Sequence, residues 1–327
     1  MKSLLIFLLA LLCINSFGQN YFEYQKTFNR IDNDVLANDL KLATKRLDTI
    51  YNSYNFVFAM HCIKGLQICC LQNDSINADK WLRKSFKQGV PLWMIRNNEI
   101  TSKVFNYYQT INTLKLYDSL NTIYKVSVNH SIARTIDSLY EIDQRFTNKV
   151  NNGFVLFRHT IYGIQWLKNN KRQFNIIREL IEQYGFPGEK LIGLPEYYQD
   201  SLEAYKNVMF YGPSIEDFRA YFMFIHYFSN PREDINNDLI QSVKEGFLQP
   251  NQFGAFNDFI ARWGRGKHGE YRYYNVWHHD PNQNNIPEIN FRREKIGLST
   301  FEEQIRNDEI YKDRIKNKTT NKLIILE

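Results

Sequence analysis

Apolar residues recur along this chain at alternating steps of four and three positions, which is the spacing of one face of an α-helix. The most regular series runs from Ile132 to Val150 and is apolar at every step except Asp143. Glycine and proline are scarce, at 15 and 8 of 327 residues, so few positions favour breaking a helix. The pattern predicts an all-α fold, with further helices over residues 36–54, 56–70, 75–86, 100–125, 174–184, 215–228, 239–247 and 253–263.

Turn-forming residues predict where several of these helices begin and end. Ser75 and Ser131 each precede an apolar series as N-cap residues do, because a serine hydroxyl accepts a hydrogen bond from the first turn. Gly185 is expected to close its helix, since a proline two residues later prevents continuation. A last short helix is expected to start at Ser299-Thr300, ahead of a charged, frayed tail over residues 312–327.

The first 18 residues have the layout of a secretory signal peptide. Lys2 supplies a positive charge, residues 4–14 form an apolar run too short to span a bilayer, and Ser16-Phe17-Gly18 places small residues where a signal peptidase cleaves. We therefore expect an exported protein, periplasmic or secreted, whose mature chain starts at Gln19. No later stretch holds 18 consecutive apolar residues, so we expect no transmembrane anchor after cleavage.

Charge and cysteine content argue against two classes of function. The formal net charge is +6, or +5 without Lys2, and the charges are interspersed along the sequence, so nucleic-acid binding is not expected. The cysteines that remain after cleavage are odd in number, and their spacing fits no zinc motif. We interpret them as small buried core residues rather than as a disulfide framework: Cys62, Cys69 and Cys70.

One segment carries features of a repeated helix pair. Gly65 occupies a small-residue position in the first predicted helix, and Ala78, Leu82 and Ser85 follow the four-then-three spacing in the second. These residues resemble a tetratricopeptide-type helical hairpin. The resemblance implies antiparallel helical hairpins in a first region over residues 19–128.

The second half carries a series of short motifs in a set order. In chain order they are Asp143-Gln144-Arg145, Tyr184-Gly185-Phe186-Pro187, Gly193, His226, Gly246 with Pro250 and Asp258, and Arg293 with Gly297-Leu298. In this order they resemble a family of uncharacterised bacterial proteins, a domain of unknown function. The chain departs from the pattern of that family at Phe186, Ile225 and Tyr271-Arg272-Tyr273-Tyr274. The resemblance implies a helical domain over residues 129–311 and makes Asp258 a candidate binding residue, but it supplies no reaction.

Asp143 is the sharpest candidate functional residue, because a carboxylate on an apolar helix face must be paired or hydrogen-bonded when it is buried. One interpretation makes Asp143 a catalytic or ligand-binding acid in a cleft. The other, which we favour, makes it half of a buried ion pair with Arg292 or Arg293.

His226 falls on or beside the core face of its predicted helix, and Arg219 lies seven residues earlier on nearly the same face. Together the two side chains would bind an anionic ligand or assist proton transfer. A core histidine is more often satisfied by a backbone carbonyl, and we favour that interpretation. Arg219 remains a candidate ligand-binding residue and His226 a candidate catalytic one.

Residues 264–290 interrupt the helical periodicity and predict a long irregular loop, where binding residues often lie. Tyr271 and Trp277 are candidates for stacking on a sugar or a peptide, although packing within the loop explains them equally well. Adjacent histidines on an extended segment point to opposite faces. No metal site or other cofactor is therefore expected, even though the loop holds His268, His278, His279 and Asp280.

The motifs of nucleophilic catalysis and phosphate binding are absent from the sequence. We therefore expect a non-enzymatic binding or scaffolding module of the cell envelope, with a protein or a small molecule as its partner. The alternative is a hydrolase-type enzyme that uses Asp143 and His226 with Arg292 or Arg293. That alternative requires these side chains to converge on one open cleft.

Overall fold

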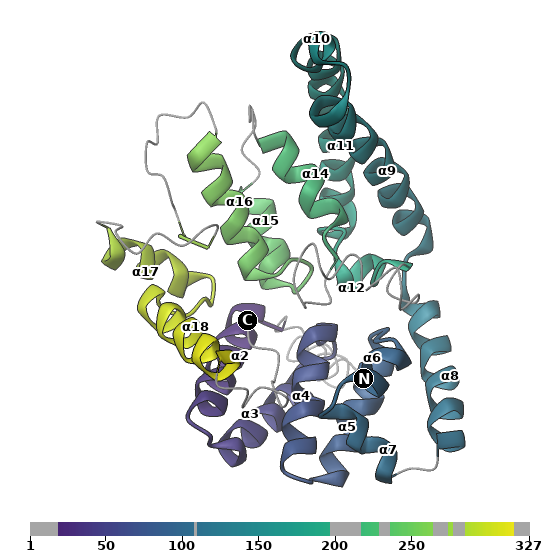
Figure 1. The fold of residues 1–327 in the computed structure, drawn as a ribbon, viewed down its shortest axis with the longest axis vertical. Helices are drawn as coiled ribbons and strands as arrows, with labels where there is room; N and C mark the ends of the chain where they lie inside the picture. The colour runs from purple at the N-terminus through teal and green to yellow at the C-terminus, as the bar shows by residue number, and fades with distance from the viewer. Residues whose placement is uncertain are drawn as a thin grey trace, which may run out of the picture.

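The chain folds into helices throughout the part that the structure describes (Figure 1). The computed structural model describes residues 19–107, 110–196, 217–228, 236–263, 274–276 and 285–316. All regular structure in these ranges is helical, which confirms the predicted all-α class. None of the helices in these ranges is both long enough and apolar enough to cross a bilayer.

The N-terminal half is built of antiparallel helices. In chain order these are α2 (Tyr21–Leu36), α3 (Leu40–Ser53), α4 (Ala59–Leu71), α5 (Ser75–Lys87), α6 (Leu92–Asn97), the 3-10 helix η1 (Thr101–Lys103), α7 (Val104–Tyr107) and α8 (Thr110–Ser127). Helices α2 and α3 form one hairpin, α4 and α5 form a second, and α8 packs against α5 (lower half of Figure 1). Hairpins of the tetratricopeptide type are consistent with this packing.

The apolar series over residues 36–54 is divided between two helices instead of forming one. Leu36 ends α2, and Asn38 adopts a left-handed conformation with φ of 62°. Asp39 then caps α3 by accepting a 3.0 Å hydrogen bond from the Leu42 amide. The break follows from these two residues, since asparagine tolerates left-handed backbone and aspartate is a strong N-cap.

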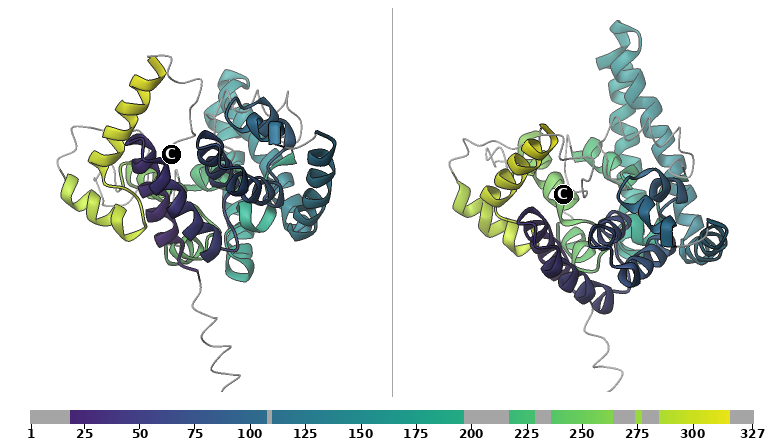
Figure 2. Two further views of the ribbon diagram at one scale, coloured as in Figure 1. Left: turned by 90° about the horizontal axis from the view of Figure 1, so that it is seen from below. Right: turned by 60° about the horizontal axis from the view of Figure 1, so that its bottom comes forward.

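The C-terminal half begins with a long helical hairpin. The elements of this half in chain order are α9 (His130–Asn152), α10 (Val155–Phe157), the π-helix η2 (Arg158–Tyr162), α11 (Gly163–Tyr184), α12 (Glu189–Ile192), α14 (Arg219–Phe228), α15 (Asn236–Lys244), α16 (Pro250–Trp263), α17 (Ile286–Lys295) and α18 (Phe301–Lys316). Helices α9 and α11 project from the rest of the molecule, and α10 lies at their far end (Figures 1 and 2). Helix α14 packs against both arms of this hairpin and against α16.

Two predicted N-caps in these halves are wrong by one or two residues. Asp74, not Ser75, caps α5 by accepting a hydrogen bond from the amide three residues on. Asn129, not Ser131, caps α9 in the same way. In both cases a residue that caps as well as serine lies one or two positions earlier, and the helix begins there. Gly185 does end α11, with φ of 87°, as predicted.

The C-terminal helices differ from the expectation in extent. Helix α17 starts at residue 286, inside the stretch expected to be an irregular loop. Helix α18 continues to Lys316, beyond the point where a frayed tail was expected. Thr300 is the cap of α18: its hydroxyl accepts a hydrogen bond from the Glu303 amide at 3.2 Å, and Glu303 accepts one from the Thr300 amide at 3.0 Å. This is the reciprocal arrangement of a capping box.

Each half has its own hydrophobic core, and polar contacts join the two. The first core centres on α2 to α5, and the second on α9, α11, α14 and α16. Glu189 of α12 accepts a 2.6 Å hydrogen bond from the Ala59 amide, at a helix start that has no side-chain cap of its own. Asn29 of α2 donates to the Gly297 carbonyl at 2.8 Å, and α18 packs on α2. The two halves are therefore joined at two places, through α12 and through the segment that contains Gly297 and α18.

Candidate functional site

Asp143 and His226 bind each other between α9 and α14. Both carboxylate oxygens of Asp143 lie 2.9 Å from Nδ1 of His226, and Gln144 donates to Oδ2 at 3.0 Å. The Asp143 side chain is fully buried, whereas the His226 side chain is 20% exposed. A buried carboxylate that accepts from Nδ1 fixes the orientation of the imidazole, and Nε2 is then the ring nitrogen that Asp143 does not engage.

This pair corrects two predictions. Asp143 does not bind Arg292 or Arg293, and Nδ1 of His226 faces a carboxylate rather than a backbone carbonyl. The physical reason is the position of α14, which packs against α9 and brings its histidine to the one polar position on the apolar face of α9. The register between two helices that are distant in sequence decides this pairing, and periodicity within one helix does not contain that information.

A seam of polar side chains surrounds the histidine. The rings of Trp166 and His226 have centroids 5.5 Å apart, and Asn170 donates to the His226 carbonyl at 3.3 Å. Gln173, one turn further along α11, donates to the Leu139 carbonyl at 2.6 Å. Nε1 of Trp166, Oδ1 of Asn170 and Oε1 of Gln173 are buried and have no hydrogen-bond partner among the residues that the structure describes. Buried polar atoms are normally paired, so unpaired ones beside an oriented histidine mark a place where a ligand or water would bind.

Sequence reasoning missed the α11 side of this seam. Trp166, Asn170 and Gln173 recur at steps of four and three, so they share a face of the helix. That face continues directly into the buried Phe174 and Ile177. The sequence does contain a signal for this side of the site, because polar residues lie on the same helix face as the predicted core residues.

Arg293 lies in a different hydrogen-bonding network, at the junction of α16, α17 and α18. The side chain is buried and donates to the carbonyls of Ser299 at 2.6 Å and Tyr274 at 2.9 Å, and also to Gln304. Burial lowers the pKa of Arg293 to about 10, and the nearby Asp258 carboxylate opposes that shift. The guanidinium remains charged at neutral pH, and its donors fasten backbone segments together.

Asp258 has the complementary structural role. Its carboxylate accepts hydrogen bonds from three consecutive amides, those of Tyr274, Asn275 and Val276, at 2.6, 3.1 and 2.6 Å. Asn275 in this turn has φ of 53°. Asp258 therefore holds a strained turn against α16.

Arg292 also stays away from Asp143. Its guanidinium pairs with Glu288, one turn earlier on α17. The enzyme hypothesis needs Asp143 and His226 with one of the two arginines. Asp143 and His226 do come together, while Arg292 and Arg293 take other partners.

Arg219 is held by two carboxylates at the start of α14. It donates to Asp217 at 2.8 and 2.9 Å and to Asp137 of α9 at 2.5 Å. Burial alone lowers the pKa of Arg219, but the two carboxylates outweigh that effect and raise it above the ordinary value. The side chain therefore joins α14 to the base of α9, and it does not share its carboxylates with His226.

A cavity of about 550 Å³ adjoins Arg219, at the junction of the two halves. Its lining comes from α8, the base of α9, α12 and the start of α14. The lining residues include Tyr124, Lys125, Val128, Ala133, Arg134 and Leu194. The Tyr124 hydroxyl accepts a 2.7 Å hydrogen bond from the Leu194 amide, so the wall of this cavity is tied across the two halves. We call this space the junction cavity.

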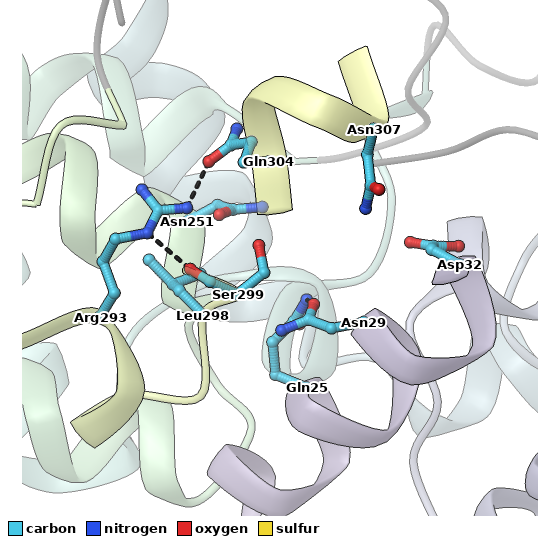
Figure 3. Close-up of a pocket in the computed structure, with 9 residues that line it drawn as sticks. All are labelled: Gln25, Asn29, Asp32, Asn251, Arg293, Leu298, Ser299, Gln304 and Asn307. Carbon is cyan, nitrogen blue, oxygen red and sulfur yellow. Dashed lines mark hydrogen bonds between the residues drawn. The ribbon is translucent and has the colours of Figure 1, made fainter. Parts of the chain in front are cut away.

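A second cavity, of about 30 Å³, lies between α2 and the C-terminal helices (Figure 3). Arg293, Ser299 and Gln304 form one side of it, with Asp32 and Asn307 on the other. This volume accommodates ordered water rather than a substrate. The small cavity is therefore part of the polar packing between α2 and α18.

The aromatic candidates Tyr271 and Trp277 lie outside the described residues, as do the possible metal ligands His268, His278, His279 and Asp280. Among the residues that are described, no three histidine, cysteine, aspartate or glutamate side chains gather as a metal site. No protein-family model, curated protein or solved structure matches this chain.

Proposed function

We propose that this chain is an exported, non-enzymatic binding module of the cell envelope that holds a small ligand in the junction cavity. The observation that carries the proposal is the volume of about 550 Å³, which is within the range of small-molecule sites. The cavity also lies where two packed halves meet, and such interfaces are frequent binding positions.

The lining suggests an amphipathic ligand. Val128, Ala133 and Leu194 supply apolar surface, whereas Lys125 and Arg134 supply exposed positive charge. The charge of Arg219 is already balanced by its own two carboxylates, so Lys125 and Arg134 are the better candidates to meet an anionic group. Glu196 also lines the cavity and offsets one of these two positive charges, so we expect a ligand with an apolar body and one acidic group.

The state of the other candidate residues supports a binding rather than a catalytic role. Three of them form hydrogen bonds that hold helices and turns in place: Arg219, Asp258 and Arg293. Export is supported by the leader pattern of the sequence. The fold also uses Gln19, whose side chain donates to the Ser53 carbonyl at 2.9 Å, so a mature chain that starts there retains this contact.

The test is mass spectrometry of the protein recovered from the envelope fraction of its own cells, under native and denaturing conditions. An additional mass in the native spectrum, lost on denaturation, identifies a bound ligand. Ala133→Trp fills the cavity and should remove that mass. Ser131→Trp, two residues away on the exposed side of α9, is the matched control and should keep it. A bare wild-type chain contradicts the proposal, as does a chain that retains residues 1–18.

A second candidate function rests on the Asp143–His226 pair. A fully buried carboxylate at 2.9 Å from Nδ1 orients a partly exposed histidine as it does in acid–base catalysis. A hydrolase that uses this pair would cleave members of a panel of p-nitrophenyl esters, phosphates or glycosides. His226→Gln and Asp143→Asn should then both abolish turnover, while Ala133→Trp leaves it intact. Turnover that is unchanged in both variants rules this candidate out.

A further inference from the structure

The end of the α9–α11 hairpin carries an unusual set of exposed apolar side chains. Residues 154–157, a Phe-Val-Leu-Phe sequence, are 60%, 69%, 71% and 41% exposed. Ile161, Ile164 and Leu167 continue down the same arm at 47%, 55% and 43%. Single exposed apolar residues are normal, but a contiguous group of this size marks an interaction site. We call these seven residues the hairpin tip.

Residues 153–158, at the end of the hairpin tip, form an ordered turn. The Phe157 amide donates to the Phe154 carbonyl at 2.9 Å, and Nε of Arg158 donates to the Gly153 carbonyl at 2.6 Å. The rings of Phe154 and Phe157 are in edge contact, with centroids 5.4 Å apart. The backbone is thus fixed by internal hydrogen bonds while the apolar side chains remain exposed.

The same hairpin concentrates positive charge. Residues 144–178 contain seven lysines and arginines and no aspartate or glutamate. The whole chain has a net charge of +6, so everything outside this stretch is net negative by one. The expectation of charge interspersed along the sequence is therefore wrong for this segment. Lys149, Lys168, Lys171 and Arg172 are all exposed, the first on α9 and the others on α11, so both arms of the hairpin carry positive charge.

The shape of the hairpin tip restricts what it binds. The tip is narrow and convex and projects away from the body of the molecule (Figures 1 and 2). A stable protein interface buries roughly 800 Å² on each partner, which a narrow end reaches only inside a matching groove. A second copy of this chain would bring two strongly positive segments together. A bilayer accepts an apolar tip without shape complementarity, and its anionic headgroups attract a basic collar.

We propose that the hairpin tip docks on a bilayer surface that contains anionic lipid. Residues 154–157 enter the boundary between headgroups and acyl chains, and the lysines and arginines of the shaft face the lipid phosphates. Lys149 lies five residues before Phe154, which is about 7 Å along a helix and within the depth of a headgroup layer. Long basic side chains reach headgroups from such positions.

This surface is separate from the junction cavity. Asp137, at the cavity, and Phe154, at the tip, are 17 residues apart, or about 25 Å along α9. Ligand binding in the cavity and docking at the tip therefore succeed or fail independently in the experiments that test them.

The experiment is vesicle flotation with the purified mature chain. One set of vesicles is pure phosphatidylcholine and the other contains about 30% phosphatidylglycerol, close to strongly anionic biological membranes. The chain should float with the anionic vesicles only. Raising the salt from about 50 to about 300 mM should weaken binding, since the Debye length shortens.

Matched substitutions separate the hairpin tip from general surface effects. Leu156→Glu should weaken binding about tenfold or more, whereas Ile76→Glu, at a site on α5 with 73% exposure, should leave it unchanged. Lys168→Glu with Lys171→Glu should weaken binding about 30-fold or more, at about a fivefold loss (about 1 kcal/mol) per basic residue. The same double change at the exposed Lys41 and Lys45 of α3 alters the net charge equally and should have little effect.

Three results would overturn the proposal. The first is equal flotation with and without phosphatidylglycerol, and the second is equal weakening by the tip and control substitutions. The third is no flotation with either vesicle, in which case the tip serves a protein with an acidic groove. Circular dichroism melts confirm that each variant is folded, so that loss of binding is not mistaken for loss of structure.

Discussion

The Trp81 indole packs directly on the backbone of Gly65. A Cβ at this glycine would lie 2.5 Å from Cδ2 of the indole, closer than any real side chain approaches. Trp81 is 1% exposed and belongs to α5, so the contact sets how closely α4 and α5 approach. Gly65 is therefore kept for space, although glycine costs stability in the middle of a helix.

Gly65→Ala should destabilise the protein. Alanine gains up to about 1 kcal/mol in helix propensity, but overpacking against a rigid ring costs about 1–3 kcal/mol, so we expect a net loss of up to about 2 kcal/mol. Urea unfolding measures the difference. The control is Gly163→Ala, where the nearest atom to the new Cβ is 3.4 Å away and the effect should be neutral or stabilising. If both alanines stabilise equally, the close approach of α4 and α5 does not restrain this position.

Lys64 and Asp32 form a buried ion pair that joins α4 to α2. Nζ lies 2.8 and 3.0 Å from the two carboxylate oxygens, and the side chains are 0% and 7% exposed. Lys64→Met should cost about 3 kcal/mol or more, because it leaves a carboxylate without its cation in the core. The exposed pair of Lys26 and Glu23 is the control, and Lys26→Met should cost under about 1 kcal/mol.

The double substitution Lys64→Met with Asp32→Leu tests the same pair from the other side. Removing both charges should restore much of the lost stability, since no ion remains to be desolvated. Chemical denaturation of the four chains gives the coupling energy between the two positions. Additive losses from the single substitutions would show that the two charges do not depend on each other.

The cysteine thiols should be unreactive in the folded chain. Burial raises the pKa of Cys70 to about 11, and burial also raises the pKa values of Cys62 and Cys69. At about pH 8, a thiol with a pKa of about 11 is only ~0.1% thiolate. Ellman's reagent should therefore react with the thiols of Cys62, Cys69 and Cys70 only after denaturation. Rapid reaction of the native chain at this pH would show that α4 opens readily.

The same shift predicts a pH dependence of stability. The pKa of Cys70 is higher in the folded chain, so the unfolded chain releases this proton first as the pH rises from about 9 to about 11. The free energy of unfolding should therefore fall across this interval. Cys70→Ala should flatten part of that fall, which denaturant titrations at about pH 8 and about pH 10 measure. A wild-type slope that is unchanged by the substitution contradicts the assignment to Cys70.

Much of the fold follows from periodicity and capping. The regular series from Ile132 onward is helix α9, and Gly185 ends α11 as expected. The close contact of Gly65 also agrees with its assignment to a small-residue position. Some errors fall at boundaries where one residue decides, as at Asn38, whose left-handed conformation separates Leu36 from the rest of its apolar stripe. Other errors concern whole elements, because no helix was predicted over most of α2, and α17 begins inside the expected loop.

The site was less predictable because its pairings are tertiary. The sequence predicted that Asp143 needs a partner, and the buried carboxylate does have one in the partly exposed His226. Helical periodicity places a residue on a face but does not say which residue of another helix faces it, so His226 and Arg293 were not distinguished as partners. The hairpin tip was not predicted for a related reason. A positive stretch and an apolar stretch indicate a docking surface only when the structure places both at one projecting end.

The identity of the partner of Asp143 can be measured directly. His226→Leu removes the group that faces the buried carboxylate and should cost about 3 kcal/mol. Asp143→Asn retains an acceptor for Nδ1 and should cost about 1 kcal/mol. When the two are combined, the loss should be smaller than the sum, because the amide no longer carries a charge that needs compensation.

Arg293 provides the contrasting cycle. Arg293→Lys loses at least one of the hydrogen bonds to the carbonyls of Ser299 and Tyr274 and should cost about 1–3 kcal/mol by itself. Because Asp143 and Arg293 share no partner, this loss should add to that of Asp143→Asn within about 0.5 kcal/mol. Urea unfolding of the single and double variants gives both coupling energies. Strong coupling to Arg293 and none to His226 would restore the structural ion pair first inferred from the sequence, and it would contradict the Asp143–His226 pair on which the hydrolase candidate rests.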